Sequence, residues 1–409
     1  MSDKLFLYDY KTKSSYSYSQ LLADLNDRNE VSEYCCTRDL YSTFLKIISS
    51  ILHKVNLVLL DSDFSDLEIN NLNLERSDLL KAKHVQKLSI DTVDALIQRI
   101  QEQSDWELTL FTSGTTGIPK KVVHKLSSLT RAVRMSEKHR EDVWGFAYNP
   151  THIAGLQVLF QALLNGNTVI NLFEASREDV LSLIINHKIT NISATATFFR
   201  MLLPLNDEFP TVKKLTSGGE RFDSKLSDKL LKAFPNARIR NVYASTEAGT
   251  ILESRDDTFS ITDEALCRII GNELQVHKSL LGEGDELDTK EDGWYATGDL
   301  VEVVEQNPIR FRFLHRKNEM INVGGYKVNP YEVEQALETH PLIRQAYVYG
   351  KANPVLGNVL MADVVVSDRV SERDLREFLS PLLQPFKIPR IISFVQAIEL
   401  TRTGKMKRN

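Results

Sequence analysis

The sequence NTVINLFEASREDVLSLIINHKITNISAT, residues 167–195, contains the pattern from which the fold class follows. Its two ends, NTVINL (167–172) and NISAT (191–195), are typical of strands, and the segment 177–187 between them is typical of a helix. A strand, a helix and a second strand joined by short connections predict two parallel strands in one sheet.

The same alternation continues on both sides of this stretch. Upstream, WELTLF (106–111) predicts a strand, and 127–139 and 152–165 predict helices. Downstream, helices are predicted at 197–203 and 224–234 and strands at 213–217 and 237–244. Elements in this order predict an α/β domain with a parallel sheet covered on both faces.

The remaining segments do not show this alternation of strands and helices. Residues 250–315 contain short strands with Gly and Asp turns, which predict a small antiparallel, β-barrel-like layer. From residue 326 the order is β-α-β-β-α-β, which predicts a compact α+β module at the end of the sequence. Residues 1–105 contain short apolar runs and no chemical motif.

Composition excludes several classes of protein. With 409 residues, 42% of them apolar and 26% charged, the chain is predicted to form two or three globular domains. The net charge of −5 gives no argument for nucleic acid or membrane, although residues 316–409 carry +4. The three cysteines fit neither a disulfide framework nor a zinc site. No targeting or membrane segment is recognisable, so a cytoplasmic location is expected.

Residues 112–121, TSGTTGIPKK, form the first chemically informative segment. Hydroxyl side chains, two glycines and two lysines are suited to binding phosphate. The P-loop pattern G-x-x-x-x-G-K-[ST] does not fit, because Pro119 stands at its second glycine and Lys121 at its Mg²⁺-binding Ser or Thr. A P-loop kinase or ATPase is therefore excluded, and a solvent-exposed turn between a strand and a helix stays open.

Seven stretches, taken in order, resemble the ANL superfamily of adenylate-forming enzymes. They are FTSGTTGIPKKVVH (111–124), NPTHIAGLQ (149–157), SGGE (217–220), NVYASTEAG (241–249), GWYATGDL (293–300), HRKNEMINVGGYKVNPYEVE (315–334) and LTRTGKMKRN (400–409). This superfamily contains acyl- and aryl-CoA synthetases, non-ribosomal-peptide adenylation domains and luciferases. Any one stretch could occur by chance, whereas all seven in this order are a specific signal over residues 105–409.

The resemblance implies a domain organisation and a reaction. A large N-terminal α/β domain would occupy 1–315, with an abbreviated first subdomain at 1–105 as in the smaller aryl- and succinylbenzoate-type ligases. A small α+β domain at 316–409 would rotate as a lid. The implied reaction joins a carboxylic acid to ATP, with Mg²⁺, to give an acyl-adenylate and pyrophosphate, and then passes the acyl group to CoA.

The resemblance also assigns the nucleotide-binding residues. The loop would clasp the β- and γ-phosphates through Thr112, Ser113, Gly114, Thr115, Thr116, Gly117 and Lys120. In VYASTEAG, Glu247 would bind Mg²⁺, Thr246 would hydrogen-bond the α-phosphate and Tyr243 would stack on adenine. A Glu after a strand is by itself more often a solvated side chain, but the run Y-x-S-T-E at a strand end favours ligand binding.

Further segments complete this set, namely Gly218, Gly219, Glu220, Ser245, Asp299 and Arg316. The two glycines would let the backbone approach adenine and the acyl group. Asp299 would accept hydrogen bonds from the ribose hydroxyls, and Arg316 would reach the ribose or a phosphate. His315 replaces the Gly usual before this Arg, which affects the local turn rather than the chemistry.

The acyl group is implied to lie near His152, at the position where the superfamily carries an aromatic residue or His beside the substrate carboxylate. A His at a helix start is equally a capping or packing residue, and His124 is expected to be structural. Other implied pocket residues are Ala194, Thr195, Gly218 and Ser245. Small side chains at several of these positions would leave room for an aromatic or medium-chain acyl group.

Lys405, in TRTGKMKR, matches the superfamily's catalytic lysine, which bridges the substrate carboxylate and the α-phosphate. Without this resemblance, a segment rich in Lys and Arg at a chain end would be interpreted as a frayed basic tail. Asn318 occupies the hinge position of the lid, where Asp is common. Gly324 and Gly325 would lie on the face that meets the pantetheine arm, which favours a thioester-forming enzyme.

Three alternatives remain open from the sequence. The acceptor could be the phosphopantetheine of a carrier protein, which presents the same thiol arm as CoA. The chain could also be a non-catalytic adenylate-binding protein. Against this stands the joint presence of Thr246, Glu247, Asp299, Arg316 and Lys405. A luciferase-type oxygenase shares the first half-reaction, but nothing in the sequence separately supports oxygen chemistry.

Overall fold

The computed structural model describes residues 4–112, 120–220, 222–284, 289, 292–323, 326–353, 357–401 and 406. The chain forms two compact units. The first consists of Met1–Asp257 with His277–Tyr295, and the second of Thr258–Val276 with Ala296–Asn409. The described part of the chain contains no helix long and apolar enough to cross a membrane.

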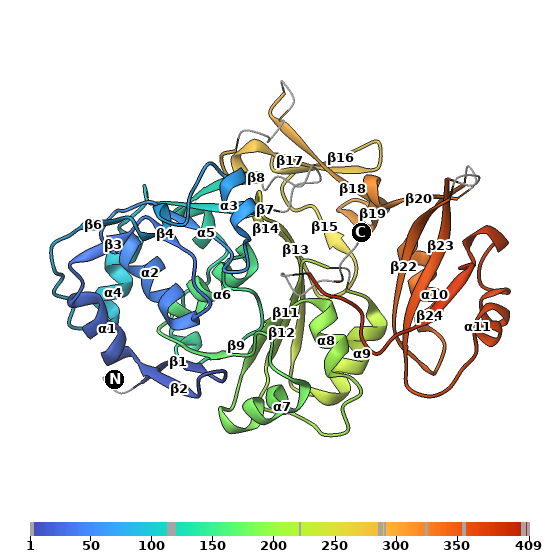
Figure 1. The fold of residues 1–409 in the computed structure, drawn as a ribbon, viewed down its shortest axis with the longest axis horizontal. Helices are drawn as coiled ribbons and strands as arrows, with labels where there is room; N and C mark the ends of the chain where they lie inside the picture. Colours follow the sequence, from blue (N-terminus) through green and yellow to red (C-terminus); the bar gives the residue numbers. More distant parts are fainter. Residues whose placement is uncertain are drawn as a thin grey trace. The chain divides into compact units, whose positions relative to one another are not determined.

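The first unit is organised around an eight-stranded sheet of order β14-β13-β12-β11-β9-β10-β1-β2 (Figure 1). Its strands are β1 (Leu5–Asp9), β2 (Ser14–Ser17), β9 (Val143–Phe146), β10 (Thr168–Asn171), β11 (Asn191–Ala194), β12 (Lys214–Gly218), β13 (Arg238–Ser245) and β14 (Gly249–Ser254). The six strands from β13 to β1 are parallel, and an antiparallel strand closes each edge. The predicted parallel α/β sheet is therefore confirmed.

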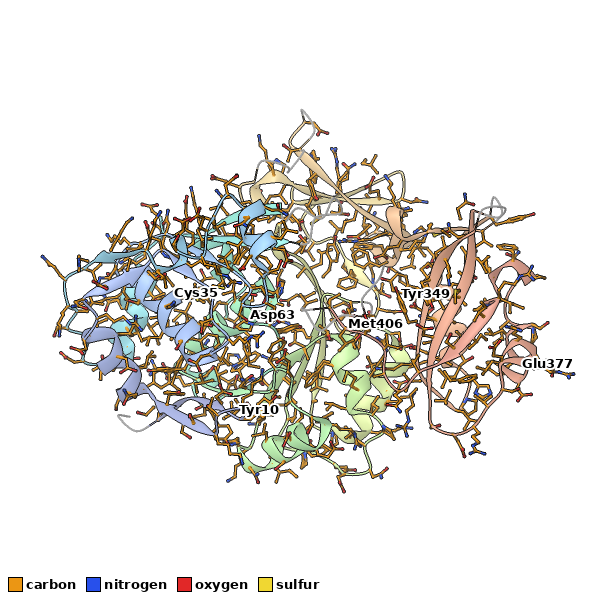
Figure 2. All side chains as sticks on the ribbon, in the orientation of Figure 1. Tyr10, Cys35, Asp63, Tyr349, Glu377 and Met406 are labelled. Atoms are coloured by element: carbon orange, nitrogen blue, oxygen red, sulfur yellow. The ribbon has the colours of Figure 1, made fainter. Side chains whose placement is uncertain are left out.

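Strand β1 joins this sheet from the other end of the chain. It pairs with β10, and the Asn171 amide donates to Asp9 Oδ1 at 3.0 Å. Tyr10, just after β1, donates its hydroxyl hydrogen to the Phe173 carbonyl at 3.3 Å (Figure 2). The sequence analysis assigned no strand to these residues.

Helices cover both faces of the large sheet, as predicted. They are α6 (Ile153–Leu163), α7 (Arg177–Asn186), α8 (Ala196–Leu202) and α9 (Ser224–Ala233). Helices α7–α9 pack on one face with Ile192 and Leu215, and α6 packs with Phe146 on the other. Ser176, Thr195 and Asp223 cap α7, α8 and α9 through their side-chain oxygens, which fixes where each of these helices begins.

A second, four-stranded sheet contains the strands around the phosphate-type loop. Its strands are β4 (Tyr34–Cys35), β5 (Leu57–Leu59), β7 (Glu107–Thr112) and β8 (Lys120–Lys125), with β8 antiparallel to β7. Other elements of this region are α1 (Tyr18–Asn26), α2 (Leu40–Leu52), α3 (Asp66–Asn71), α4 (Val93–Gln101) and the pair β3 (Glu30–Ser32) with β6 (Ala82–His84). The loop at 112–121 thus connects two strands of a hairpin, not a strand and a helix.

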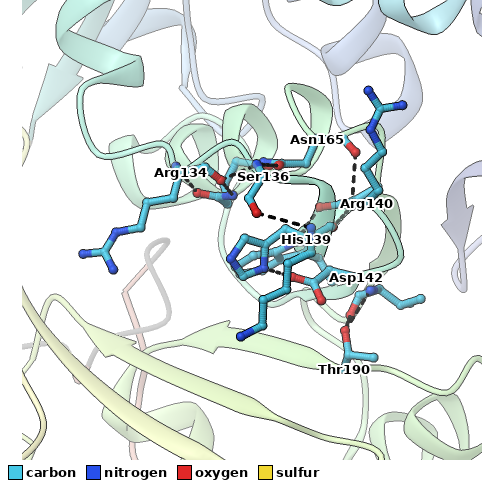
Figure 3. Close-up of polar contacts among 12 residues, drawn as sticks. Arg134, Ser136, His139, Arg140, Asp142, Asn165 and Thr190 are labelled. Atoms are coloured by element: carbon cyan, nitrogen blue, oxygen red, sulfur yellow. Dashed lines mark hydrogen bonds and ion pairs between the residues drawn. The ribbon is translucent and has the colours of Figure 1, made fainter.

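The helix predicted at 127–139 is wrong. Only α5 (Leu126–Thr130) and a 3-10 turn at Glu137–His139 form there. Side chains outside the segment compete for its backbone (Figure 3). Asn165 accepts from the Ser136 N–H and donates to the Arg134 carbonyl, both at 3.1 Å, and the Asn167 amide donates to the His139 carbonyl at 2.6 Å. These bonds favour an extended loop over a helix.

The second unit contains the two smaller layers predicted from the sequence. An antiparallel sheet has the order β15-β19-β18-β17-β16, formed by β15 (Phe259–Ser260), β16 (Cys267–Ile270), β17 (Glu273–His277), β18 (Trp294–Gln306) and β19 (Ile309–Arg316). The α+β module consists of β20 (Ile321–Val323), β21 (Tyr326–Val328), α10 (Pro330–Glu338), β22 (Ile343–Asn353), β23 (Gly357–Val366), α11 (Glu372–Leu379) and β24 (Ile391–Phe394). Its helices bury Leu337 and Leu375 against one face of its sheet.

Candidate active site

The parallel strands of the large sheet end at a common edge, and several of the implied pocket residues lie there. Ala194 ends β11, Gly218 ends β12 and Ser245 ends β13. Thr195 follows β11 and caps α8 by accepting from the Phe198 N–H. Because ligands of α/β sheets bind beyond the carboxyl ends of the strands, this edge is the candidate active site.

The segment Thr246–Ala248 forms the turn between β13 and β14. We call it the STE turn, after the residues Ser245, Thr246 and Glu247 at its start. Ser245 pairs with Gly249, and Ser245 Oγ accepts from the Ala248 N–H at 3.2 Å. Gly249 has a φ of +66°, a conformation that favours glycine. The Glu247 carboxylate accepts no hydrogen bond from the described residues, which leaves it available to a cation.

Three hydrogen bonds from outside hold the carbonyl groups of the STE turn. Nε2 of His124 lies 2.6 Å from the Thr246 carbonyl oxygen, and since that oxygen only accepts, Nε2 carries the hydrogen. The Gly282 N–H donates to the Glu247 carbonyl, and Arg131 Nη2 donates to the Ala248 carbonyl, each at 2.6 Å. With its carbonyls held this way, the turn has a fixed orientation.

Gly282 also brings its own segment against β8. Val123 and Glu283 exchange backbone hydrogen bonds of 2.7 and 2.8 Å. A Cβ on Gly282 would lie 2.6 Å from the Val123 carbonyl oxygen, so this approach requires glycine. The sequence analysis missed both Arg131 and Gly282, because neither belongs to a motif.

His124 links the STE turn to β8, the strand that leaves the 112–121 loop. It is 1% exposed, and burial lowers the pKa of its imidazole. The hydrogen bond to Thr246 and the charge of Glu247 oppose this shift, and Arg131 adds to it. The ring is therefore neutral near pH 7.

We expect His124 to make the folded protein less stable in mild acid. The unfolded chain takes up this proton below about pH 6.5, whereas the folded chain resists it, so stability is fully present above that pH and falls as the pH decreases. The slope is at most about 1.4 kcal/mol per pH unit for one group. His124→Gln keeps a donor for Thr246 and should flatten the pH dependence in urea unfolding between pH 7 and 5.

A matched control is available at His84, which is 86% exposed. Its one ion pair among the described residues, with Glu30 at 3.2 Å, lies at the surface, so His84→Gln should change the stability less than His124→Gln does. Burial also lowers the pKa of His53 and His187, so part of the slope should remain in the His124 variant. An identical slope in wild type and His124→Gln would contradict the assignment.

The phosphate-type loop itself lies mostly outside the described residues. Thr112 and Lys120 pair at the ends of β7 and β8, so the loop closes a hairpin. The predicted phosphate-binding residues Ser113, Gly114, Thr115, Thr116 and Gly117 are not among the described residues, nor are the side chains of Thr112 and Lys120. Their roles stay predictions.

At the end of β12, the SGGE stretch turns away from the sheet. Gly219 has a φ of +82°, a conformation that favours glycine. Glu220 Oε2 accepts from the Thr197 N–H at 2.8 Å, in the first turn of α8, where a carboxylate is stabilised by the helix dipole. The structure thus gives Glu220 a local partner, and its contact with a nucleotide stays a prediction. Tyr243 lies in β13, two residues before Ser245.

His152 is the N-cap residue of α6, but its side chain makes no capping hydrogen bond. Its Nε2 lies 3.9 Å from Oδ2 of Asp61, which is 6% exposed. Asp61 also accepts from the Asn149 amide and from the Asp63 N–H, each at 3.0 Å. The sequence analysis missed Asp61, which lies in a region without motifs.

In the second unit, Asp299 and Arg316 lie together. They face each other across β18 and β19, and Arg316 Nε donates to Asp299 Oδ1 at 2.8 Å. Lys317 likewise pairs with Glu273 at 2.5 Å. The two residues implied to bind ribose and phosphate are therefore neighbours.

Other predicted residues of the second unit lie outside the described ranges. They are Gly324, Gly325 and Lys405, together with the side chain of Asn318. Met406, which Figure 2 labels, forms an antiparallel bridge with Leu400.

Comparisons with known proteins find relatives that are named as CoA ligases. The 4-hydroxybutyrate–CoA ligase 1 of Metallosphaera sedula is 28% identical over 74% of this chain and 61% of its own length. The 2-succinylbenzoate–CoA ligase of Bacillus velezensis is 28% identical over 75% of this chain and 68% of its own. The matched part thus spans about two thirds of these relatives.

Solved structures show the same fold. O-succinylbenzoate CoA synthetase (MenE) from Bacillus subtilis, in complex with ATP and magnesium ion, is 21% identical, with a TM-score of 0.71 over 99% of this chain and 95% of that one. ATP-bound MatB from Rhodopseudomonas palustris is 17% identical, with a TM-score of 0.73 over 98% and 94%.

Two family profiles match the sequence directly. Residues 332–405 match the AMP-binding enzyme C-terminal domain. Residues 52–271, more than half of the chain, match the AMP-binding enzyme family and contain both the 112–121 loop and the STE turn. On this evidence the chain belongs to the AMP-binding enzyme family.

Proposed function

We propose that this protein is an AMP-forming acid–thiol ligase that activates a carboxylic acid with ATP and transfers the acyl group to CoA. The observation that carries the proposal is the hydrogen bond between His124 and Thr246. It joins the strand leaving the phosphate-type loop to the turn that presents Glu247. A strand that leaves a phosphate-type loop, joined to a turn that presents a carboxylate, suits a Mg-nucleotide site.

In the first half-reaction, a carboxylate oxygen of the acid forms a bond to the α-phosphorus of ATP. The bond from that phosphorus to the bridging oxygen breaks, and pyrophosphate leaves with it. The loop N–H groups and Lys120 would hold the departing phosphates, and Thr246 would orient the α-phosphate. In the second half-reaction a thiolate sulfur attacks the acyl carbon and AMP leaves.

The carboxylate of Glu247 fits Mg²⁺. Within the described ranges, no three His, Cys, Asp or Glu side chains are grouped to hold a metal ion. Mg²⁺ needs only one or two carboxylates when phosphate oxygens and water supply the other ligands. Bound there, it would neutralise charge on the phosphates, and Glu247 would hold it on a turn fixed by three hydrogen bonds.

The second half-reaction is proposed to use residues 316–409 as a rotating lid that pivots near Asn318. Lys405 would serve adenylation, and Gly324 and Gly325 would let the pantetheine arm pass during thiol attack. That relatives are named as CoA ligases supports CoA as the acceptor. A carrier-protein phosphopantetheine is the alternative, and a cytoplasmic location stays a prediction.

The test is pyrophosphate release from Mg-ATP with aryl, short-, medium- and long-chain acids, with and without CoA. We expect one acid class to give turnover that CoA accelerates, with an acyl-CoA as product. If the rate of pyrophosphate release is the same with and without CoA, a carrier protein becomes the proposed acyl acceptor. Binding of ATP without turnover on any acid would leave only a non-catalytic adenylate-binding protein.

A further inference from the structure

A cavity of about 320 Å³ lies at the edge of the large sheet that is opposite the candidate active site. Strands β1, β10 and β9 are parallel neighbours, so their amino ends lie at one edge. Lys4 stands just before β1, Glu141 before β9 and Gly166 before β10, and all three line the cavity. Because the candidate active site lies at the carboxyl ends of the strands, the proposed function makes no use of this cavity.

The size of the cavity is that of a ligand site. Protein interiors contain few voids larger than a water molecule. An apolar cavity of about 150 Å³ holds benzene, and ligand pockets begin at about 300 Å³. The cavity at the amino edge therefore has room for a molecule of one or two rings.

The floor of the cavity is apolar. Tyr18, Ile97 and Leu164 line it with exposures of 1%, 8% and 4%. The Tyr18 hydroxyl already donates to the Asn167 carbonyl at 2.8 Å, so Tyr18 offers its ring to the cavity. Met135 also lines the cavity and is 47% exposed. A ligand with an apolar body would remove this surface from water, and the flexible Met side chain can adapt to its shape.

The charged side chains that line the cavity are matched with one another. Arg140 pairs with Asp94 at 3.2 Å through Nη2 and with Glu137 at 3.0 Å through Nε. The Lys4 ammonium donates to the Arg140 carbonyl at 2.6 Å and lies 3.7 Å from Glu141. Three carboxylates against two cations disfavour an anionic ligand, and a cationic ligand would find each carboxylate already beside a cation. An uncharged ligand meets neither cost.

Two hydrogen-bond donors on residues that line the cavity remain for a ligand. Arg140 uses Nε and Nη2 in its ion pairs, and its Nη1 donates to none of the described residues. The Ser136 hydroxyl accepts from the Lys138 N–H at 3.2 Å, while its own hydrogen reaches no acceptor in the described ranges. Arg140 and Ser136 are both labelled in Figure 3. A carbonyl or other acceptor oxygen on the ligand would use these donors.

We propose that this cavity binds a small, uncharged molecule that has an apolar body and an acceptor oxygen at one end. The body would lie on the floor formed by Tyr18, Ile97 and Leu164. The oxygen would accept hydrogen bonds from Arg140 and Ser136. This inference does not depend on the proposed function, since the cavity and the candidate active site lie at opposite edges of the sheet.

The test is isothermal titration calorimetry with benzamide, benzoate and benzylamine. The three share one ring and carry a neutral, a negative and a positive group on it. The wild-type protein should bind benzamide at least about tenfold more tightly at the cavity than the two ions, because these lose hydration on entering an apolar cavity. Benzoate could also bind at the candidate active site, so only binding that the cavity variants weaken is assigned to the cavity.

Two variants assign the binding to the cavity. Met135→Glu places a charge beside the apolar floor. Val93→Phe fills space next to Gly166, where an added Cβ would meet only the Val93 side chain, at 3.5 Å, among the described residues within 4 Å. Each variant should weaken benzamide binding about tenfold, the effect of losing part of an apolar contact. Met201→Glu is the matched control, because Met201 is 52% exposed on α8 and should not affect binding.

Thermal unfolding of each variant shows that it is folded before titration. Absence of benzamide binding to the wild type, or equal binding to wild type, Met135→Glu and Val93→Phe, would overturn the inference. Tighter binding of benzylamine or benzoate at the cavity would overturn the assignment of an uncharged ligand. Pyrophosphate release is measured separately, so its failure with every acid would end the proposed function and leave the titration result intact.

Discussion

Lys405→Ala should lower the rate of acyl-adenylate formation by at least about a hundredfold, equivalent to about 3 kcal/mol of transition-state stabilisation. Negative charge develops between the attacking carboxylate and the α-phosphate, and a lysine that bridges them stabilises this charge more in the transition state than in the ground state. The effect should therefore appear in kcat of pyrophosphate release, with a smaller change in the KM for ATP.

Two controls make the Lys405 result specific. Lys407→Ala removes a neighbouring positive charge from the same segment and should leave the rate within a few-fold of wild type. Thioester formation from a synthetic acyl-adenylate bypasses the first half-reaction and should survive in Lys405→Ala. Full pyrophosphate release by Lys405→Ala would show that the basic segment has no part in adenylation.

Glu247→Gln should have the second largest effect. It keeps the size of the side chain but removes the charge that would bind Mg²⁺, so pyrophosphate release should fall on the order of a hundredfold and need more Mg²⁺. The STE turn should keep its conformation, because His124, Gly282 and Arg131 bind its backbone carbonyls. A magnesium titration of the rate, with thermal unfolding alongside, measures both.

Glu283→Gln is the matched control for Glu247→Gln. Glu283 is exposed, and its carboxylate lies 3.9 Å from the Lys125 ammonium. Its replacement should leave the magnesium requirement unchanged. If both variants behave like wild type, Glu247 is a solvated side chain and the metal ligand must be sought elsewhere.

The alternating elements of the large sheet were predictable because each signal is local. Strands β10–β13 and helices α6–α9 follow one another with short connections, and β11, β12 and β13 lie side by side in the sheet, while β9 lies between β10 and β11. The failures had non-local causes. The helix predicted at 127–139 is displaced by bonds from Asn165 and Asn167, and β1 pairs with a strand far along the chain.

The residues of the candidate site likewise fall into those that the sequence predicts and those that it does not. Gly218, Ser245, Thr246 and Glu247 lie in recognisable motifs at strand ends, and the structure brings their strands to one edge. The groups that hold them had no such signal. Arg131 and Gly282 bind backbone carbonyls, which every residue possesses, so no pattern of residue types marks their partners.

The pairing of β1 with β10 has a consequence during synthesis on the ribosome. The two strands are separated by about 162 residues in sequence, so β1 emerges long before its partner exists. Until β10 follows, β1 can pair only with β2, and the apolar Phe6 and Leu7, both fully buried in the finished fold, lack their parallel neighbour. Contacts of such long range form slowly, and unpaired strands can associate between chains. We therefore expect the nascent protein to rely on chaperones most strongly before residue 171 has left the exit tunnel.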